Sequence, residues 1–216
     1  MFHESNYNII ILDLHPKKDT KNIKYIKCDV SEITDIRNLI DQNIIPKNYN
    51  HIVTLAGGAI KNEWNSFEDV KIEDIKKSID INLMGHVNVI HEFYPYMKNL
   101  NGQKSITMIS SINSFASYGL AGYSAAKSGL NGFMYAIAQE LSRYNIRINI
   151  VSPGTVVSNL SLNEDKKDWE ILKKGTMLNH FTSPEDIAKT ILMLSTNNSI
   201  TGQNIIVDSG QLIKKK

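Results

Sequence analysis

Short apolar runs alternate with segments of helical periodicity along the whole chain. Each run holds four to six residues, a length that fits strands buried on both faces of a parallel sheet. The runs are Asn8–Leu12, Ile23–Ile26, His51–Leu55, Ser105–Ile109, Ile146–Val151 and Asn204–Val207. This alternation predicts an α/β fold with right-handed crossovers: a doubly wound, mostly parallel sheet with helices on both faces.

Three segments between the runs carry the clearest helix signals. Ser31 is a candidate N-cap for a helix whose apolar face would hold Ile33, Ile36, Leu39 and Ile40. A longer amphipathic pattern is formed by Leu130, Phe133, Met134, Ile137, Ala138 and Leu141. Ser183 is followed by Pro184 and two acidic residues, which is typical of a helix start.

Composition narrows the class of protein. A chain of 216 residues with 42% apolar and 21% charged residues, and no linker or repeat, predicts one globular domain over residues 1–216. The net charge of +2 does not favour a nucleic-acid partner. No apolar run approaches the ~20 residues of a membrane span, and Met1–Asn8 does not resemble a secretory signal. The single cysteine, Cys28, fits a reducing compartment, so we expect a cytoplasmic protein without membrane contact.

Tyr123 and Lys127 form the first candidate chemical pair. Residues at i and i+4 share one helix face, so the phenol and the ammonium group can reach the same point. A lysine cation ~4 Å from the phenol, at an effective dielectric of ~20, favours the phenolate by ~4 kcal/mol. That interaction predicts a Tyr123 pKa lowered by about three units, into the working range of a general acid or base. The same spacing also occurs by chance on helices.

Two expected strands end in residues that suit a binding cleft. Ser110 and Ser111 follow the run Ser105–Ile109, and a hydroxyl at a carboxyl strand end can bond a substrate oxygen. Pro153 and Gly154 follow the run Ile146–Val151, where they would let the backbone approach a flat ligand. Either pair also fits an ordinary turn.

Taken together, these pieces resemble the short-chain dehydrogenase/reductase family. The matching segments follow the family's order and spacing over nearly the whole chain: Ile79–Gly85, Ile106–Ser111, Tyr123–Gly129, Asn145–Gly154, Ser183–Ala188, Ile200–Gln203 and Val207–Gly210. The resemblance implies a Rossmann-like fold and an NAD(P)-dependent oxidoreductase. The reaction would be hydride transfer between nicotinamide and an alcohol or carbonyl.

The resemblance also implies catalytic roles. Tyr123 would be the general acid/base, and Lys127 would lower its pKa and hold the nicotinamide ribose. Ser111 would orient the substrate oxygen; Ser110 is the alternative, because the loop to Tyr123 is one residue shorter than in many relatives. Asn82 would kink its helix and position a water for a proton relay.

Cofactor contacts follow in the same way. Asp13 would bond the adenosine ribose hydroxyls and repel a 2′-phosphate, which favours NAD over NADP. The other implied contacts are Asp29, Val30, Ala56, Gly57, Tyr123, Lys127, Pro153, Gly154, Val156 and Ser158. The histidines show no metal-ligand spacing, so no metal is expected. The polar segment 163–169 favours a small polar alcohol or ketone as substrate, and the family implies a homodimer or homotetramer.

One family feature is not found in this sequence. The family begins with a strand, a glycine-rich turn and a helix, whereas the first glycine here is Gly57. About 25 to 30 residues of the pattern would be absent, including a strand between Asn8–Leu12 and His51–Leu55. These two strands could pair directly, another chain could fill the gap, or the first ~50 residues could pack poorly. We favour a fourth interpretation, that the chain is an incomplete reading of a longer gene.

Two other functions stay open at this point. A catalytically silent family remnant could act through subunit association, with the apolar stripe of residues 130–141 serving either a subunit contact or the core. Sugar-nucleotide epimerases and dehydratases share the Tyr-x-x-x-Lys pattern, but they usually carry a larger C-terminal substrate domain.

Overall fold

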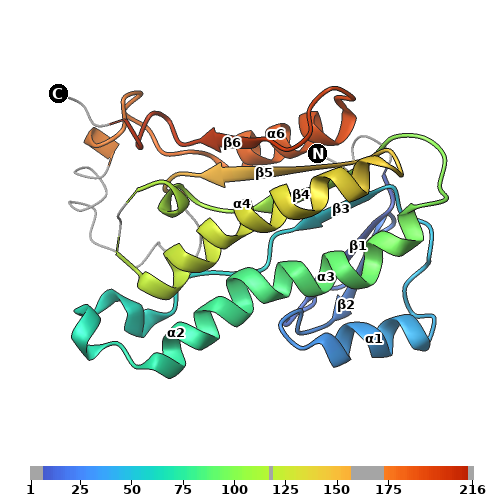
Figure 1. Ribbon diagram of the computed structural model, residues 1–216, viewed down its shortest axis with the longest axis horizontal. Helices are drawn as coiled ribbons and strands as arrows, with labels where there is room; N and C mark the ends of the chain where they lie inside the picture. The colour runs from blue at the N-terminus through green and yellow to red at the C-terminus, as the bar shows by residue number, and fades with distance from the viewer. Residues whose placement is uncertain (1–6, 117–118, 157–172, 214–216) are drawn as a thin grey trace.

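The computed structural model describes residues 7–116, 119–156 and 173–213 of this chain (Figure 1). Each of the six expected apolar runs forms a strand, and its bounds lie within two residues of the prediction. The strands are β1 (Ile9–Asp13), β2 (Ile23–Lys27), β3 (His51–Thr54), β4 (Lys104–Ile109), β5 (Ile146–Pro153) and β6 (Asn204–Val207).

The strands form two parallel sheets. β1 pairs with β2, while the larger sheet has the order β3-β4-β5-β6. The longest ladder runs from Lys104 opposite Ile146 to Ile109 opposite Val151. Because all ladders between these strands are parallel, their carboxyl ends lie at one edge of each sheet. The expected Rossmann-like parallel fold is confirmed.

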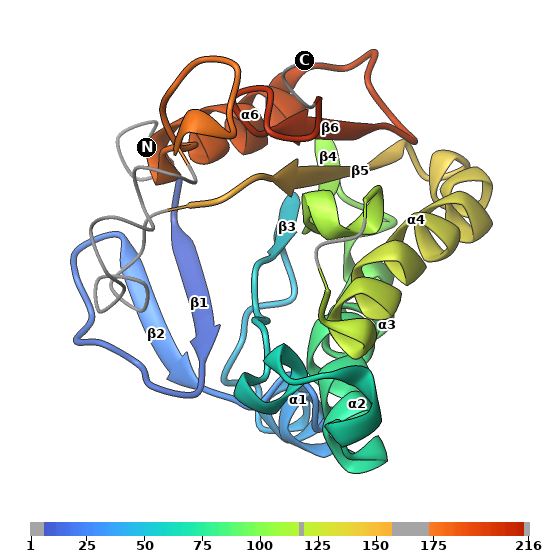
Figure 2. The same cartoon turned by 90° about the vertical axis from the view of Figure 1, so that its left-hand side faces the viewer.

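The sheet is interrupted between β1 and β3. In Figure 2, β2, β1 and β3 follow one another across the molecule. Within the described residues, β1 is hydrogen-bonded to β2 and β3 to β4, and no ladder joins β1 to β3. Direct pairing of these two strands, one of the four alternatives above, is therefore wrong.

Helices cover both faces of the larger sheet (Figures 1 and 2). On one face lie α3 (Gly85–Phe93) and α4 (Ala121–Ser142), and on the other lies α6 (Pro184–Thr196). A π-helical segment, η3 (Asp80–Met84), joins α2 (Ile72–Ile79) to α3. Short 3₁₀ helices include η1 (Lys61–Trp64), η2 (Phe67–Asp69), η4 (Tyr94–Met97) and η5 (Ile112–Ser114).

Of two helix starts predicted from capping signals, one is confirmed and one is wrong. The Ser183 hydroxyl accepts a hydrogen bond from the Asp186 amide at 3.0 Å, so the predicted cap of α6 is confirmed. The predicted cap of α1 (Ile33–Asp41) is wrong, because that helix begins after Glu32. The Ser31 hydroxyl instead donates to the Asp29 carboxylate at 2.6 Å.

The main core lies between the larger sheet and the apolar faces of the helices that cover it. From α4, Leu130, Met134 and Leu141 are at most 2% exposed and pack with residues of β4 and β5 in one cluster. Phe133 and Ile137 pack against the same cluster. The α4 stripe therefore serves the core. Within the described ranges, no helix combines the length and apolarity that crossing a membrane requires.

The interruption of the sheet predicts uneven protection of backbone amides. A two-stranded sheet is marginally stable by itself, whereas β5 is buried at every residue. We expect amides of β4 and β5 to exchange with deuterium at least about tenfold more slowly than those of β1 and β2. Hydrogen-exchange NMR measures both sets, and equal protection would contradict two sheets of different stability.

Candidate active site

The candidate site lies where β3 and β4 end and α4 begins. Tyr123 and Lys127 stand in the first two turns of α4. The loop after β3 carries Ala56 and Gly57, and the loop after β4 carries Ser110 and Ser111. The parallel arrangement of the strands therefore brings segments far apart in the sequence to one edge of the sheet.

The Lys127 side chain is turned toward β4. Its Nζ donates a hydrogen bond to the Ile109 carbonyl at 2.9 Å and lies 3.4 Å from His86 Nε2. Lys127 is only 3% exposed. Burial disfavours the charged form and lowers the pKa of Lys127 to about 8.

Tyr123 shares this compartment, but its pKa moves in the direction opposite to our expectation. The Lys127 Nζ lies 5.7 Å from the centre of the Tyr123 ring and bonds to Ile109 instead. Burial raises the pKa of the phenol, and a hydrogen bond with Ser111 partly opposes that rise. Desolvation, which sequence spacing does not reveal, therefore outweighs the predicted lowering by Lys127.

The two serines after β4 have different partners. The Ser110 hydroxyl donates to the Lys127 carbonyl at 2.9 Å and thereby holds α4 against β4. The Ser111 hydroxyl accepts from the Asn113 amide at 3.2 Å and also bonds with the phenol of Tyr123. Ser111 is therefore the serine next to Tyr123, and Ser110 bonds to the backbone of α4.

Asn82 links the helix interruption to the loop after β3. It lies in the π-helical segment η3, so the helix is locally altered where a kink was expected. Its fully buried amide accepts from the Gly58 N–H at 2.8 Å and donates to the Gly58 carbonyl at 3.0 Å. A third bond goes to the Ser78 carbonyl at 3.0 Å.

Gly57 allows this loop to pass close to both Asn82 and Lys127. Its φ is +143°, a conformation that residues with a Cβ rarely adopt. A Cβ at this position would lie 2.5 Å from Asn82 Oδ1 and 3.3 Å from Lys127 Nζ. The position therefore requires glycine for backbone and for steric reasons.

The residues expected on the adenosine side lie at the ends of β1 and β2. Asp13 is exposed at the end of β1, and its carboxylate accepts from the His15 amide at 2.7 Å. Asp29 follows β2, and its carboxylate accepts from the Ser31 amide and hydroxyl. Val30 contacts the helix at Gly85. This group belongs to the two-stranded sheet, whereas Tyr123 and Lys127 adjoin the four-stranded one.

The residues expected at the end of β5 have mainly protein neighbours. The Gly154 amide donates to the Val207 carbonyl at 3.0 Å, and a Cβ at Gly154 would lie 2.8 Å from Asp208 Cβ. The close approach expected at Pro153 and Gly154 therefore joins this turn to the end of β6. Val156 bridges to Thr182, and Ser158 lies outside the described residues.

Two polar residues near the site were not among the predicted catalytic and cofactor-binding residues. Glu63 Oε1 accepts from the amides of Gly122 and Tyr123 at 2.6 and 3.2 Å, and so caps the helix that carries Tyr123. That helix starts after Leu120, whose φ is +59° and which offers no side-chain cap. His86 bonds to Thr54 and lies beside Lys127. Helix periodicity could place His86 on the inner face, but a cap from 59 residues away leaves no local sequence signal.

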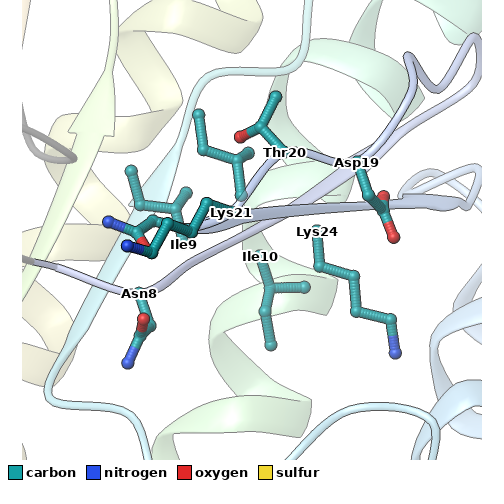
Figure 3. Close-up of a pocket in the computed structure, with 9 residues that line it drawn as sticks. Asn8, Ile9, Ile10, Asp19, Thr20, Lys21 and Lys24 are labelled. Atoms are coloured by element: carbon teal, nitrogen blue, oxygen red, sulfur yellow. The ribbon is translucent and has the colours of Figure 1, made fainter.

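Two shallow cavities lie apart from this group. One, of about 250 Å³, lies on β1 and β2 and is lined by residues that include Ile9, Ile10, Asp19, Thr20, Lys21 and Lys24 (Figure 3). The other, of about 280 Å³, is lined by Lys27 and residues of and next to α1. Neither includes Tyr123 or Lys127, so the candidate site rests on its hydrogen-bonded side chains.

Comparison with known proteins gives consistent matches over most of the chain. A family model described as enoyl-(acyl carrier protein) reductase matches residues 1–211. A 3-oxoacyl-[acyl-carrier-protein] reductase of Thermotoga maritima is 31% identical over 189 residues, covering 86% of this chain and 75% of the relative. An NAD-dependent glycerol dehydrogenase of Listeria innocua is 27% identical over 230 residues, covering 99% and 87%.

Solved structures match the fold in the same way. A short chain dehydrogenase family protein from Francisella tularensis has a TM-score of 0.82 at 28% identity, covering 96% of this chain and 88% of that one. A 4-hydroxyisoleucine dehydrogenase complexed with NADH has a TM-score of 0.85 at 25% identity, covering 99% and 91%.

The contacts of Gly57 predict a position-specific effect of adding one methyl group. Gly57→Ala should destabilise the fold by about 1–3 kcal/mol and displace the Asn82 amide, because the new Cβ meets Asn82 Oδ1 at a positive φ. Urea unfolding measures the change. Gly58→Ala is the matched control, since a Cβ there has no neighbour within 4 Å. Equal stability of the two variants would contradict this close packing.

Proposed function

This chain belongs to the short-chain dehydrogenase/reductase family, and from that membership we propose that it is an NAD(P)-dependent oxidoreductase interconverting an alcohol and a carbonyl. The observation that carries the proposal is the grouping of Ser111, Tyr123 and Lys127 in one largely buried compartment at the carboxyl ends of the strands. A phenol, a hydroxyl and an ammonium group suit proton transfer at an oxygen atom.

The fit of a nicotinamide dinucleotide differs along its length. Lys127 fits the nicotinamide ribose end of the cofactor. Asp13 and Asp29, which are acidic groups at strand ends, fit the adenosine end. The sequence contains no Gly-x-x-x-Gly-x-Gly turn for the middle of the cofactor, and within the described ranges no ladder joins β1 to β3. The residues therefore fit the two nucleoside ends and provide no glycine-rich backbone cradle for the pyrophosphate. We infer weak cofactor binding by this chain.

The proposed chemistry assigns one task to each side chain. When bound, the nicotinamide supplies or accepts the hydride. Tyr123 holds the proton that passes to the substrate oxygen on reduction and returns on oxidation. Because burial raises its pKa, the phenol is protonated at neutral pH, which suits the donating direction. Ser111 orients the substrate oxygen, and Asn82 holds the Gly57–Gly58 loop against the site through its bonds to Gly58.

We propose NAD rather than NADP, and a small polar alcohol or ketone as substrate. Asp13, exposed at the end of β1, supports the first choice because a carboxylate repels a 2′-phosphate. The names of two relatives support both choices: an NAD-dependent glycerol dehydrogenase, and a 4-hydroxyisoleucine dehydrogenase complexed with NADH.

We also propose that the protein self-associates and works in a reducing compartment. Trp64 and Phe67 are 69% and 72% exposed beside α2, and such apolar surface supports a homodimer or homotetramer. The single, buried Cys28 supports a cytoplasmic setting.

A second candidate function is a catalytically silent member that acts through subunit association. It is favoured by the break in the sheet: among the residues that the structure describes, no ladder joins β1 to β3. The buried α4 stripe does not supply its contact surface. Cofactor binding and turnover distinguish the two functions.

Titration with reduced cofactor, followed by NADH fluorescence, tests the proposed oxidoreductase. We expect binding at high micromolar to millimolar NADH and weaker binding of NADPH. Tyr123→Phe should keep NADH binding and lower turnover of small ketones by about 10²- to 10⁴-fold, since it removes the transferable proton. No binding at millimolar NADH, together with a stable oligomer in light scattering, would favour the silent alternative.

A further inference from the structure

Three buried side chains from different elements form a hydrogen-bonded row behind the candidate site. Thr54 ends β3, His86 lies in the first turn of α3 and Lys127 in α4; all three are at most 6% exposed. Thr54 Oγ1 lies 2.6 Å from His86 Nδ1, and His86 Nε2 lies 3.4 Å from Lys127 Nζ. The family resemblance assigns no role to His86.

The chemistry of the donors fixes the tautomer of His86. A lysine ammonium group only donates hydrogen bonds, so His86 Nε2 must accept and cannot carry a proton. The single proton of the neutral ring is then on Nδ1, facing the Thr54 hydroxyl oxygen. A hydrogen bond with the Ala56 backbone adds a further contact to the ring. Thr54 at Nδ1 and Lys127 at Nε2 therefore set which ring nitrogen of His86 carries the proton.

We propose that His86 is a positioning residue for Lys127, holding its ammonium group through a neutral imidazole that Thr54 orients. This inference rests on the proposed function of Lys127. One N–H of the ammonium group is directed to the Ile109 carbonyl and a second to His86 Nε2, which leaves one for a ribose hydroxyl. Without His86, the ammonium group at the end of the flexible Lys127 side chain would keep only the hydrogen bond to Ile109.

The groups around this row allow only the neutral ring. The titratable groups along this row are His86 from α3 and Lys127 from α4, with Tyr123 beside Lys127. The other partners in the row are uncharged: Thr54 from β3 bonds to His86, and the Ile109 carbonyl from β4 accepts from Lys127. A proton on Nε2 would point at the ammonium group of Lys127. Burial and the Lys127 charge accordingly lower the pKa of His86 to about 3.

The tautomer gives a test that needs neither cofactor nor turnover. Long-range ¹H–¹⁵N NMR of the wild-type imidazole should show Nδ1 protonated and Nε2 unprotonated, without titration between pH 5 and 7.5. A His86 ring that titrates near its ordinary pKa of ~6.5, or that carries its proton on Nε2, would overturn the proposal. Because the wild-type protein is measured, this result is independent of whether any variant folds.

Paired variants test the effect on Lys127. His86→Leu should lower the proton affinity of Lys127 about tenfold, since a hydrogen bond to a charged group is lost, while His86→Gln keeps an acceptor and should largely restore it. Lysine-selective NMR, with the signal assigned by its loss in Lys127→Met, measures this pKa. His51→Leu is the matched control, because His51 bonds to Ser105 at 2.9 Å in the same sheet and does not contact Lys127.

Cofactor kinetics separate this inference from the proposed function. In an active enzyme, His86→Leu should raise the KM for NADH about tenfold more than it lowers kcat, and His86→Gln should reverse most of that rise. If the wild type binds no NADH while the tautomer and the Lys127 shift are as expected, the proposed function fails and the positioning role of His86 stands. Equal Lys127 pKa values in His86→Leu, His86→Gln and His51→Leu would overturn the role.

Discussion

The buried ammonium group of Lys127 is the constraint around which the candidate site is organised. A buried charge must be hydrogen-bonded, and Lys127 meets that requirement with the carbonyl that ends β4 and with the imidazole of His86. The Ser110 hydroxyl, which directly follows β4, donates a hydrogen bond to the backbone carbonyl of Lys127. Side chain and backbone of one residue therefore fix α4 against the edge where the strands end.

The position of Tyr123 follows from that arrangement. Glu63 caps the first turn of α4 through the amides of Gly122 and Tyr123, and Lys127 holds the second turn. The phenol is thus carried on a helix fixed at two points, next to Ser111. Gly57 closes the other side, because only a residue without a Cβ lets the loop pass between Asn82 and Lys127. Rigid support of this kind is what positioned proton transfer requires.

Sequence patterns predicted the parts of this structure that depend on local periodicity. Runs of apolar residues located the strands, and Ser183 identified the start of α6. The spacing of Tyr123 and Lys127 correctly placed both in one compartment, but it did not show that Lys127 turns toward Ile109. The direction of the Tyr123 pKa was wrong for that reason, since helix spacing contains no information on burial or on competing acceptors.

Interactions between segments far apart along the chain could not be predicted from the sequence. Glu63 caps a helix 59 residues further along the chain, and His86 meets Lys127 from a helix 41 residues earlier. The position of the interruption, between β1 and β3, was expected because the glycine-rich turn is not found in the sequence. The division of the strands into two separate sheets depends on packing, which the periodicity of the sequence does not determine.

We propose that this site holds a dinucleotide by its two ends, with Lys127 at the nicotinamide ribose. Saturation-transfer-difference NMR with NADH tests it most directly, because it reports which protons of a weakly bound ligand touch the protein. We expect signals from both the adenine and the nicotinamide riboside, and Lys127→Ala should lose mainly the nicotinamide-side signals. Saturation confined to the adenine end in the wild type, or unchanged by Lys127→Ala, would contradict it.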